Sequence, residues 1–121
     1  KLNKILLNSE KTTQNNKNLQ MNLALNYGSK SEIINAVNLI KRKKINFSIL
    51  NLDKHLYTAD IPDPDLLIRT GNTNRLSNFM LWQLAYSEIY FEKKLWPDFT
   101  IKDYNKILNN FRKTKRNFGK I

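Results

Sequence analysis

IPDPDLLIRTGNTNRLSNF, residues 61–79, predicts a strand, a polar loop and the start of a helix in immediate succession. Pro62 and Pro64 exclude regular structure before the strand, because each proline fixes φ and lacks a backbone donor. The continuous apolar run 66–68 is typical of a central strand that is covered on both faces. The polar loop 69–75 follows, and Ser77 is predicted to cap a helix that includes Phe79, Met80, Trp82, Gln83 and Ala85.

The flanking sequence alternates predicted helices with predicted strands. An apolar stripe in 2–7 predicts a helix that ends in the polar stretch 12–17, and alternating apolar residues in 19–25 predict a strand. A second amphipathic helix is expected to open at Ser31, and the last helix at a Thr100 cap. Between them, 47–56 predicts a short helix or an extended connection, 89–91 a strand and 96–99 a turn. The order predicts an α/β fold with a parallel β-sheet flanked by helices.

The composition is that of a small, strongly basic chain. Its 121 residues hold 21 Lys and Arg against 10 Asp and Glu, a formal charge of +11. The absence of cysteine excludes a disulfide scaffold, a zinc ribbon and a thiol nucleophile, and no apolar run has the length that spanning a bilayer requires. The charge suggests a polyanionic partner. A solvated surface is the favoured interpretation of the basic runs at 41–44 and near the C-terminus (Lys113, Lys115, Arg116 and Lys120).

The loop after the predicted strand is a candidate anion site. In open α/β sheets, ligands gather beyond the carboxyl ends of the strands. Arg69 and Arg75 supply guanidinium groups that match phosphate oxygens in a bidentate way, and a helix start at Ser77 would add free N–H groups and the positive end of a dipole. The alternative, equally weighted on spacing alone, is that Ser77 is an ordinary cap and the arginines pair with Asp63, Asp65 or Glu88.

Glu88 is a candidate metal ligand. It follows the predicted helix eleven residues after Ser77, and one carboxylate near a phosphate site is the usual way to hold Mg²⁺. Taken alone, a glutamate in the context Ser-Glu-Ile-Tyr is more often a surface or capping residue. No nucleophilic triad, no GxGxxG motif and no Walker A motif is present.

Residues 63–99 resemble the cis-prenyltransferase family, and within it most closely the bacterial undecaprenyl diphosphate synthases. The resemblance rests on DPDLLIRTG at 63–71, RLSNF at 75–79, LWQ at 81–83, AYSEIYF at 85–91 and LWPDF at 95–99. The upstream stretches LALNYG at 23–28 and LYTAD at 56–60 match as well. The resemblance thus covers nearly the whole chain.

The resemblance implies a transferase that condenses isopentenyl diphosphate onto an allylic diphosphate such as farnesyl diphosphate, with cis stereochemistry, to make a polyprenyl diphosphate lipid carrier for cell-wall synthesis. It implies Mg²⁺ dependence, a homodimer, and a cytoplasmic location with at most peripheral membrane association. The implied residues are Arg69, Arg75, Leu76 and Ser77 on the isopentenyl diphosphate, Glu88 on Mg²⁺, and secondary roles for Trp96, Asp98 and Arg116. For Trp96 and Asp98, packing and capping are at least as well supported.

Three local departures from the family pattern stand out. Family members usually carry Gly-Gly-Glu or a variant before the second arginine, where this chain has GNTN at 71–74. They often have Gly-Gly-Arg after Asn-Tyr, where this chain has Gly28 and then Ser-Lys. The arginine of a C-terminal Arg-x-Gly element, thought to reach a phosphate across the dimer, aligns with Asn117, so that Arg116 would have to substitute for it.

The family's N-terminal Asp-Gly-Asn-Gly-Arg-Trp-Ala motif, which carries the Mg²⁺-binding aspartate and the allylic site, has no counterpart here. Because Lys1 is also not an initiator methionine, we expect residues 1–121 to be the C-terminal half of a single catalytic domain. No catalytic residue is then expected within the chain, and the isolated chain should be inactive.

Two other functions are compatible with the sequence. A basic nucleic-acid-binding module would interleave aromatics with its Lys and Arg runs, but the aromatics here lie in apolar patterns away from those runs, so no nucleic-acid partner is expected. A non-catalytic partner subunit of a prenyltransferase would have no need of Arg69, Arg75, Ser77 and Glu88 together.

Overall fold

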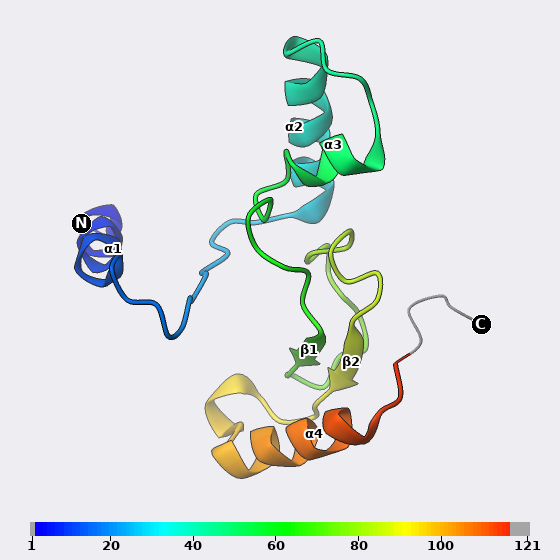
Figure 1. The fold of residues 1–121 in the computed structure, drawn as a ribbon. Coiled ribbons are helices and arrows are strands. Elements are labelled where there is room, and N and C mark those ends of the chain that lie inside the picture. Colours follow the sequence, from blue (N-terminus) through cyan, green and yellow to red (C-terminus); the bar gives the residue numbers. More distant parts are fainter. Residues whose placement is uncertain (1, 117–121) are drawn as a thin grey trace.

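The structure, a computed structural model, describes residues 2–116 (Figure 1), so the expectations for Asn117 and Lys120 lie outside the described residues. Two strands lie between a helical pair at one end and a single helix at the other, while the first helix stands apart (Figure 1). In chain order the elements are α1 (Leu2–Thr13), α2 (Ser29–Arg42), α3 (Ile49–Asp53), β1 (Leu66–Arg69), β2 (Glu88–Phe91), the 3₁₀ helix η1 (Trp96–Asp98) and α4 (Ile101–Lys113).

The two strands pair in parallel, as predicted. Leu66 lies opposite Glu88 at the amino end, and Arg69 lies opposite Phe91 at the carboxyl end. The expectation of a strand covered on both faces is wrong for this chain: all four β1 residues are only half-buried, and Ile89 and Phe91 on β2 are exposed. The reason is that β1 and β2 form the whole sheet within residues 2–116, so neither strand is interior.

The predicted strand at 19–25 does not form. The segment is irregular, and Leu19, Met21, Leu23 and Leu25 are all exposed, at 83%, 76%, 61% and 60%. Period-2 alternation describes a chain that fits a sheet, but a strand also needs a neighbour to hydrogen-bond with. No such neighbour exists among the described residues, so the pattern is present without the pairing.

The predicted helix after Ser77 is also wrong, because residues 77–86 form successive turns. Ser77, Asn78 and Met80 have φ of 50°, 63° and 45°, in the left-handed region that a helical run cannot contain. The crossover between the parallel strands is therefore made without a regular helix.

The main apolar cluster lies between α2 and α3. Ala36 and Ile40 of α2 pack with Leu52 and Leu56, and Trp82 of the crossover covers them. The indole N–H of Trp82 also donates to Asp53 Oδ1 at 2.8 Å. Helix α2 begins at Ser29, two residues before the predicted Ser31.

The crossover itself caps α2. The N-cap residue Gly28 makes no side-chain cap bond. Asn78 supplies the missing cap bonds: its carbonyl accepts from Ser29 N at 2.8 Å, and its Oδ1 accepts from Lys30 N at 2.9 Å. A Cβ at Gly28 would lie 2.8 Å from Asn78 Nδ2, so a larger residue there would displace the side chain that caps α2.

A buried carboxylate ties three segments together. Glu32, 1% exposed, accepts from the Tyr27 hydroxyl, from Tyr57 N at 2.8 Å and from Gln83 Nε2 at 3.2 and 3.3 Å. Gln83 Nε2 also donates to Thr58 Oγ1 at 3.0 Å. Because a buried charge is tolerated only when it is well hydrogen-bonded, this network specifies how the crossover sits on α2.

Helix α4 begins at the predicted Thr100 cap. Asp103 closes a capping box with Thr100, and Lys94 binds Asp103 at 2.8 Å. The ion pair with Lys94, followed by the Thr100 bonds, holds the pKa of Asp103 well below its usual range. Cap and ion pair together fix the start of α4 to the loop after β2.

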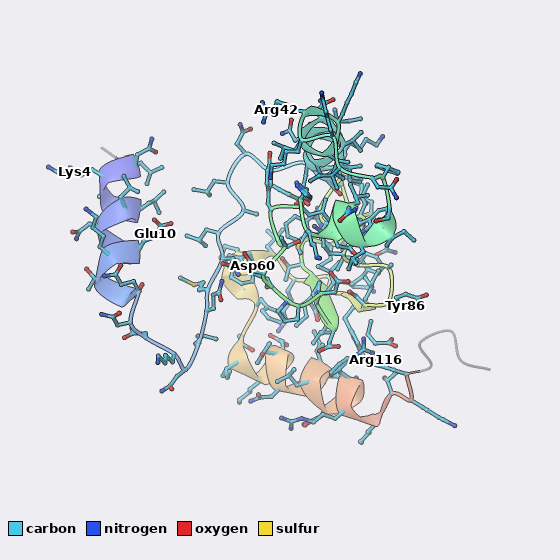
Figure 2. The ribbon with its side chains drawn as sticks, turned by 45° about the horizontal axis from the view of Figure 1, so that its top comes forward. Lys4, Glu10, Arg42, Asp60, Tyr86 and Arg116 are labelled. Atoms are coloured by element: carbon cyan, nitrogen blue, oxygen red, sulfur yellow. The ribbon has the colours of Figure 1, made fainter. Side chains whose placement is uncertain are left out.

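Much apolar surface stays uncovered. The chain exposes 10508 Å², against roughly 6,800 Å² expected for a compact monomer of this mass. Helix α1 buries no residue and lies apart from the remaining elements in both views (Figures 1 and 2).

Within residues 2–116, no helix combines the length and the apolar character needed to cross a bilayer.

Glu32→Ala should destabilise the chain by about 3 kcal/mol, because it removes the acceptor shared by the Tyr27 hydroxyl, Tyr57 N and Gln83 Nε2 and leaves a cavity at a buried position. Urea unfolding followed by far-ultraviolet circular dichroism measures this. Glu10→Ala, on the exposed α1, is the matched control and should be near neutral; equal effects of the two variants would contradict the proposed role of the network.

The same network predicts a loss of stability at alkaline pH. Burial, and then the bond to Glu32, raise the pKa of Tyr27 from 10.0 to about 12. Since the folded state favours the protonated phenol, its contribution is complete below pH 10.0 and is lost as the pH rises toward about 12. Urea midpoints measured from pH 9 to 12 should fall less steeply in Tyr27→Phe than in wild type. Tyr104→Phe, on the exposed side of α4, is the control and should keep the wild-type slope. A Tyr27→Phe profile parallel to wild type would contradict the role of Tyr27 in the alkaline loss of stability.

Candidate functional site

The loop that follows β1 is fastened to the segment that follows β2. Gly71 N donates to Lys94 O at 2.7 Å, and Asn72 N donates to Glu92 O at 3.1 Å. Glu92 N in turn donates to Arg69 O at 2.7 Å. The carboxyl ends of the two strands therefore form one continuous rim, the position at which open parallel sheets bind ligands.

The backbone of this loop is left-handed at two successive residues. Gly71 has φ 94° and Asn72 has φ 53°. Apart from its chain neighbours, no atom lies within 4 Å of where a Cβ at Gly71 would stand, so backbone conformation rather than crowding favours glycine there. Asn72 stands where the family pattern has its second glycine. Because asparagine is among the side chains that best tolerate this region, the departure at Asn72 is compatible with the turn.

Neither loop arginine is neutralised by a carboxylate within residues 2–116, where the ion pairs are Lys94–Asp103 and Arg116–Asp65. Arg69 is half-buried and its Nε donates to Thr73 Oγ1 at 3.2 Å, while Arg75 is exposed. The alternative that both arginines pair with nearby acidic residues is therefore not what the structure has.

Leu76 and Ser77 begin the crossover. Leu76 is half-buried and its carbonyl accepts from Phe79 N at 3.0 Å, whereas Ser77 is exposed. Since no helix starts at Ser77, the expected help of a helix dipole in binding an anion is absent. What remains is an accessible hydroxyl two residues after Arg75.

Glu88 lies at the other end of the sheet. Glu88 is the first residue of β2 and lies opposite Leu66, whereas Arg69 is the last residue of β1. Glu88 and Arg69 are therefore separated by three residues along the strand direction, or roughly 10 Å. The described residues contain no group of three metal-binding side chains. Glu88 therefore fits Mg²⁺ only as a single ligand, with water and phosphate oxygens completing the shell.

Trp96 and Asp98 of η1 make only local contacts among the described residues. Trp96 is 74% exposed and stacks on Phe99 with ring centroids 6.2 Å apart. Asp98 N donates to Leu95 O at 3.0 Å within the 3₁₀ turn, and the cap of α4 is Thr100.

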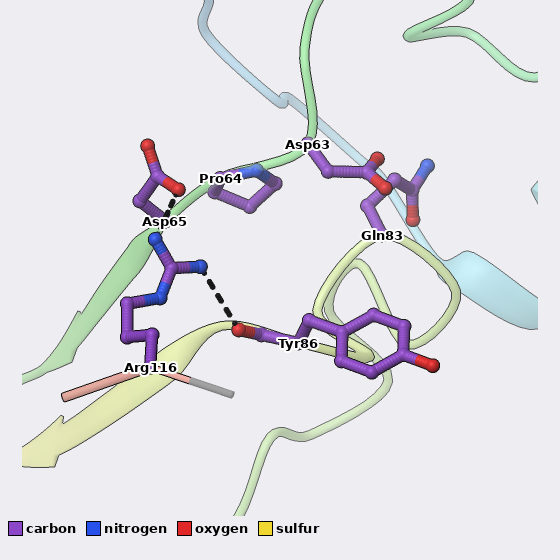
Figure 3. A pocket seen from close by; sticks show the side chains of 6 residues that line it. All are labelled: Asp63, Pro64, Asp65, Gln83, Tyr86 and Arg116. Atoms are coloured by element: carbon purple, nitrogen blue, oxygen red, sulfur yellow. Dashed lines mark hydrogen bonds and ion pairs between the residues drawn. The ribbon is translucent and has the colours of Figure 1, made fainter. Parts of the chain in front are cut away.

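Arg116 lies at the amino ends of the strands, away from the Arg69 rim. It pairs with Asp65 and donates to the Tyr86 carbonyl, beside a pocket of about 240 Å³ (Figure 3). Asp63 and Gln83 also line this pocket. Gln83 Oε1 is buried there without a hydrogen-bond partner among the described residues. Tyr86 and Gln83 lie within the motifs AYSEIYF and LWQ, but a backbone carbonyl acceptor and a buried amide have no sequence signal that marks them as lining a pocket.

Comparison with known proteins places the chain in a family. Residues 1–119 match the family described as "Putative undecaprenyl diphosphate synthase". The isoprenyl transferase of Fusobacterium nucleatum is 46% identical over the whole chain and 53% of that protein, and the Rickettsia typhi isoprenyl transferase is 43% identical over 98% of the chain and 53% of its own length. The chain thus spans about half the length of the curated relatives it matches.

Solved structures agree in fold. A probable undecaprenyl diphosphate synthase from Campylobacter jejuni superposes with a TM-score of 0.87 at 39% identity, covering 98% of this chain and 56% of that one. Lavandulyl diphosphate synthase from Lavandula x intermedia, in complex with dimethylallyl diphosphate, gives a TM-score of 0.91 at 37% identity, covering 98% and 54%. Together with the parallel strand pair and the loop motif, these matches show that the chain belongs to the cis-prenyltransferase family of the undecaprenyl diphosphate synthases.

Proposed function

We propose that this chain supplies the isopentenyl-diphosphate half of a cis-prenyltransferase active site. The complete site would join C4 of isopentenyl diphosphate to C1 of an allylic diphosphate such as farnesyl diphosphate. The C1–O bond of the allylic substrate would break to release its diphosphate group, and a proton would leave C2 of the isopentenyl unit. Repetition with cis geometry would give a long polyprenyl diphosphate, with undecaprenyl diphosphate as the product class suggested by the relatives' names.

The observation that carries the proposal is the pair of unneutralised guanidinium groups on the rim beyond β1. Arg69 and Arg75 have no carboxylate partner among the described residues, and a planar guanidinium binds phosphate oxygens in a bidentate way. The left-handed turn at Gly71 and Asn72 bends the chain between them. Leu76 would position the crossover, and the accessible Ser77 hydroxyl would donate to the same diphosphate.

Glu88 is proposed as a Mg²⁺ ligand. The ion would stabilise the negative charge that develops on the departing diphosphate. Because Glu88 lies at the amino end of β2, opposite Leu66, it cannot share one ion with the Arg69 rim of its own sheet without spanning the strand length. A site shared with the other copy of a homodimer, as the family resemblance implies, is consistent with this separation.

The isolated chain should lack activity. It has bare apolar faces on β2 and α1 and an unpaired strand-like segment at 19–25, and nothing in it resembles the family's allylic site. Turnover needs both diphosphates held side by side. By the family resemblance, the assembled enzyme would be cytoplasmic, with at most peripheral membrane association.

Arg69→Gln and Arg75→Gln should each weaken binding of isopentenyl diphosphate about tenfold or more, because each variant removes a charge-assisted contact. Isothermal titration calorimetry on the 121-residue chain measures this, and Arg112→Gln, on the exposed end of α4, is the matched control. Unchanged affinity in both loop variants would remove the basis of the proposal.

Activity should appear only by complementation. The chain alone should give no product from radiolabelled isopentenyl diphosphate and farnesyl diphosphate. Joined to the part of the Fusobacterium nucleatum relative that it does not cover, it should elongate farnesyl diphosphate in a Mg²⁺-dependent reaction. Arg69→Gln in the joined protein is the control, and it should lower kcat/KM for isopentenyl diphosphate. Polyprenyl product from the chain alone would refute the need for a second half.

A further inference from the structure

One arginine bridges the amino ends of both strands. Arg116 Nη1 forms an ion pair with the carboxylate of Asp65, and Arg116 Nη2 donates to the carbonyl of Tyr86 at 3.1 Å (Figure 3). Asp65 is the residue immediately before β1, and Tyr86 precedes β2 by two residues. The forked guanidinium thus contacts both chain segments at the point where they enter the sheet.

Two further hydrogen bonds join the same two segments. Glu88 N donates to Asp65 O at 3.0 Å, and Ser87 Oγ donates to Pro64 O. Asp65 is therefore held through its backbone by Glu88 and through its side chain by Arg116. Any movement of Asp65 would be transmitted directly to the backbone of Glu88.

The approach of Arg116 is set by the end of α4. Thr114 N donates to Phe111 O at 3.0 Å, and Thr114 Oγ1 donates to Asn110 O at 3.2 Å, which fixes the turn out of the helix. The Arg116 guanidinium carbon lies 5.6 Å from the centre of the Phe111 ring, within cation–π range. The Arg116 side chain is 18% exposed, so its surroundings already limit the rotamers that it can adopt.

Geometry, rather than charge, gives this contact its importance. The Asp65 side chain is 69% exposed, and an ion pair with such a partner contributes little by attraction alone. The forked contact to two acceptors, one just before each strand, is specific to arginine, since the single ammonium group of lysine offers no planar fork. A two-stranded parallel ladder of four residues is marginal by itself, so a clamp at one end has a large effect on its order.

We infer that Arg116 is a positioning residue that clamps the amino ends of β1 and β2 and thereby fixes Glu88. Its importance for the reaction rests on the proposed Mg²⁺ role of Glu88, whereas the clamp itself does not. In this account Arg116 makes no contact with phosphate, in contrast to the substitute role suggested by the family resemblance.

Amide hydrogen exchange on the 121-residue chain tests the clamp without any assay of activity. Arg116→Met should speed exchange at residues 88–91 about tenfold, the effect of losing bonds to a charged group, and leave α2 unchanged. Arg112→Met is the matched control, and Arg116→Lys should restore protection only in part. Unchanged exchange at 88–91 in Arg116→Met, or equal acceleration in α2, would overturn the inference.

Kinetics of the chain joined to the uncovered part of the Fusobacterium nucleatum relative test the consequence for Glu88. Arg116→Met should raise the half-saturating Mg²⁺ concentration about tenfold, while KM for isopentenyl diphosphate stays within about twofold. The reverse pattern, a raised KM with unchanged Mg²⁺ dependence, would show that Arg116 acts on phosphate and would overturn the inference. If the unmodified joined protein makes no product, the proposed function fails, and the exchange experiment decides the clamp by itself.

Discussion

The parallel pairing of β1 with β2 is the constraint on which the rest of the structure depends. Parallel strands bring both carboxyl ends to one edge and both amino ends to the other. The Arg69 loop and the segment 92–94 therefore form one rim, bonded through Gly71, Asn72 and Glu92. The same pairing puts Glu88 and the Arg116 clamp at the opposite edge. The proposed phosphate-binding loop and the proposed Mg²⁺ ligand Glu88 thus lie at opposite ends of a strand pair four residues long.

The crossover between the strands contains no regular helix and is held in place by specific contacts to α2. Residues 77–80 contain three left-handed residues, which are costly for serine and methionine. The compensation comes from α2: Asn78 caps its first turn, and Gln83 joins the buried Glu32 network. Held in this way, the crossover presents Ser77 to solvent beside Arg75. The order of Ser77 therefore depends on the helical pair, whereas that of the Arg69 loop depends on the sheet.

Local patterns in the sequence predicted the elements that local physics decides. The apolar runs at 66–68 and 89–91, their parallel pairing and the Thr100 cap were confirmed, because each depends on nearby residues or on chain order. The strand at 19–25 failed because pairing needs a neighbour, and the helix after Ser77 failed because tertiary contacts to α2 override its propensity. The residues of the anion loop could be chosen from their types and spacing. Their freedom from acidic partners, the distance to Glu88 and the direction of Arg116 depend on register and packing, which a single sequence does not display.

A structure of the joined protein with isopentenyl diphosphate bound tests the central claim most directly. The account predicts that the diphosphate oxygens lie within hydrogen-bond distance of the guanidinium groups of both Arg69 and Arg75, on the rim beyond the carboxyl ends of the strands. A diphosphate bound instead at the amino edge, against Arg116, or one that contacts neither loop arginine, would contradict it.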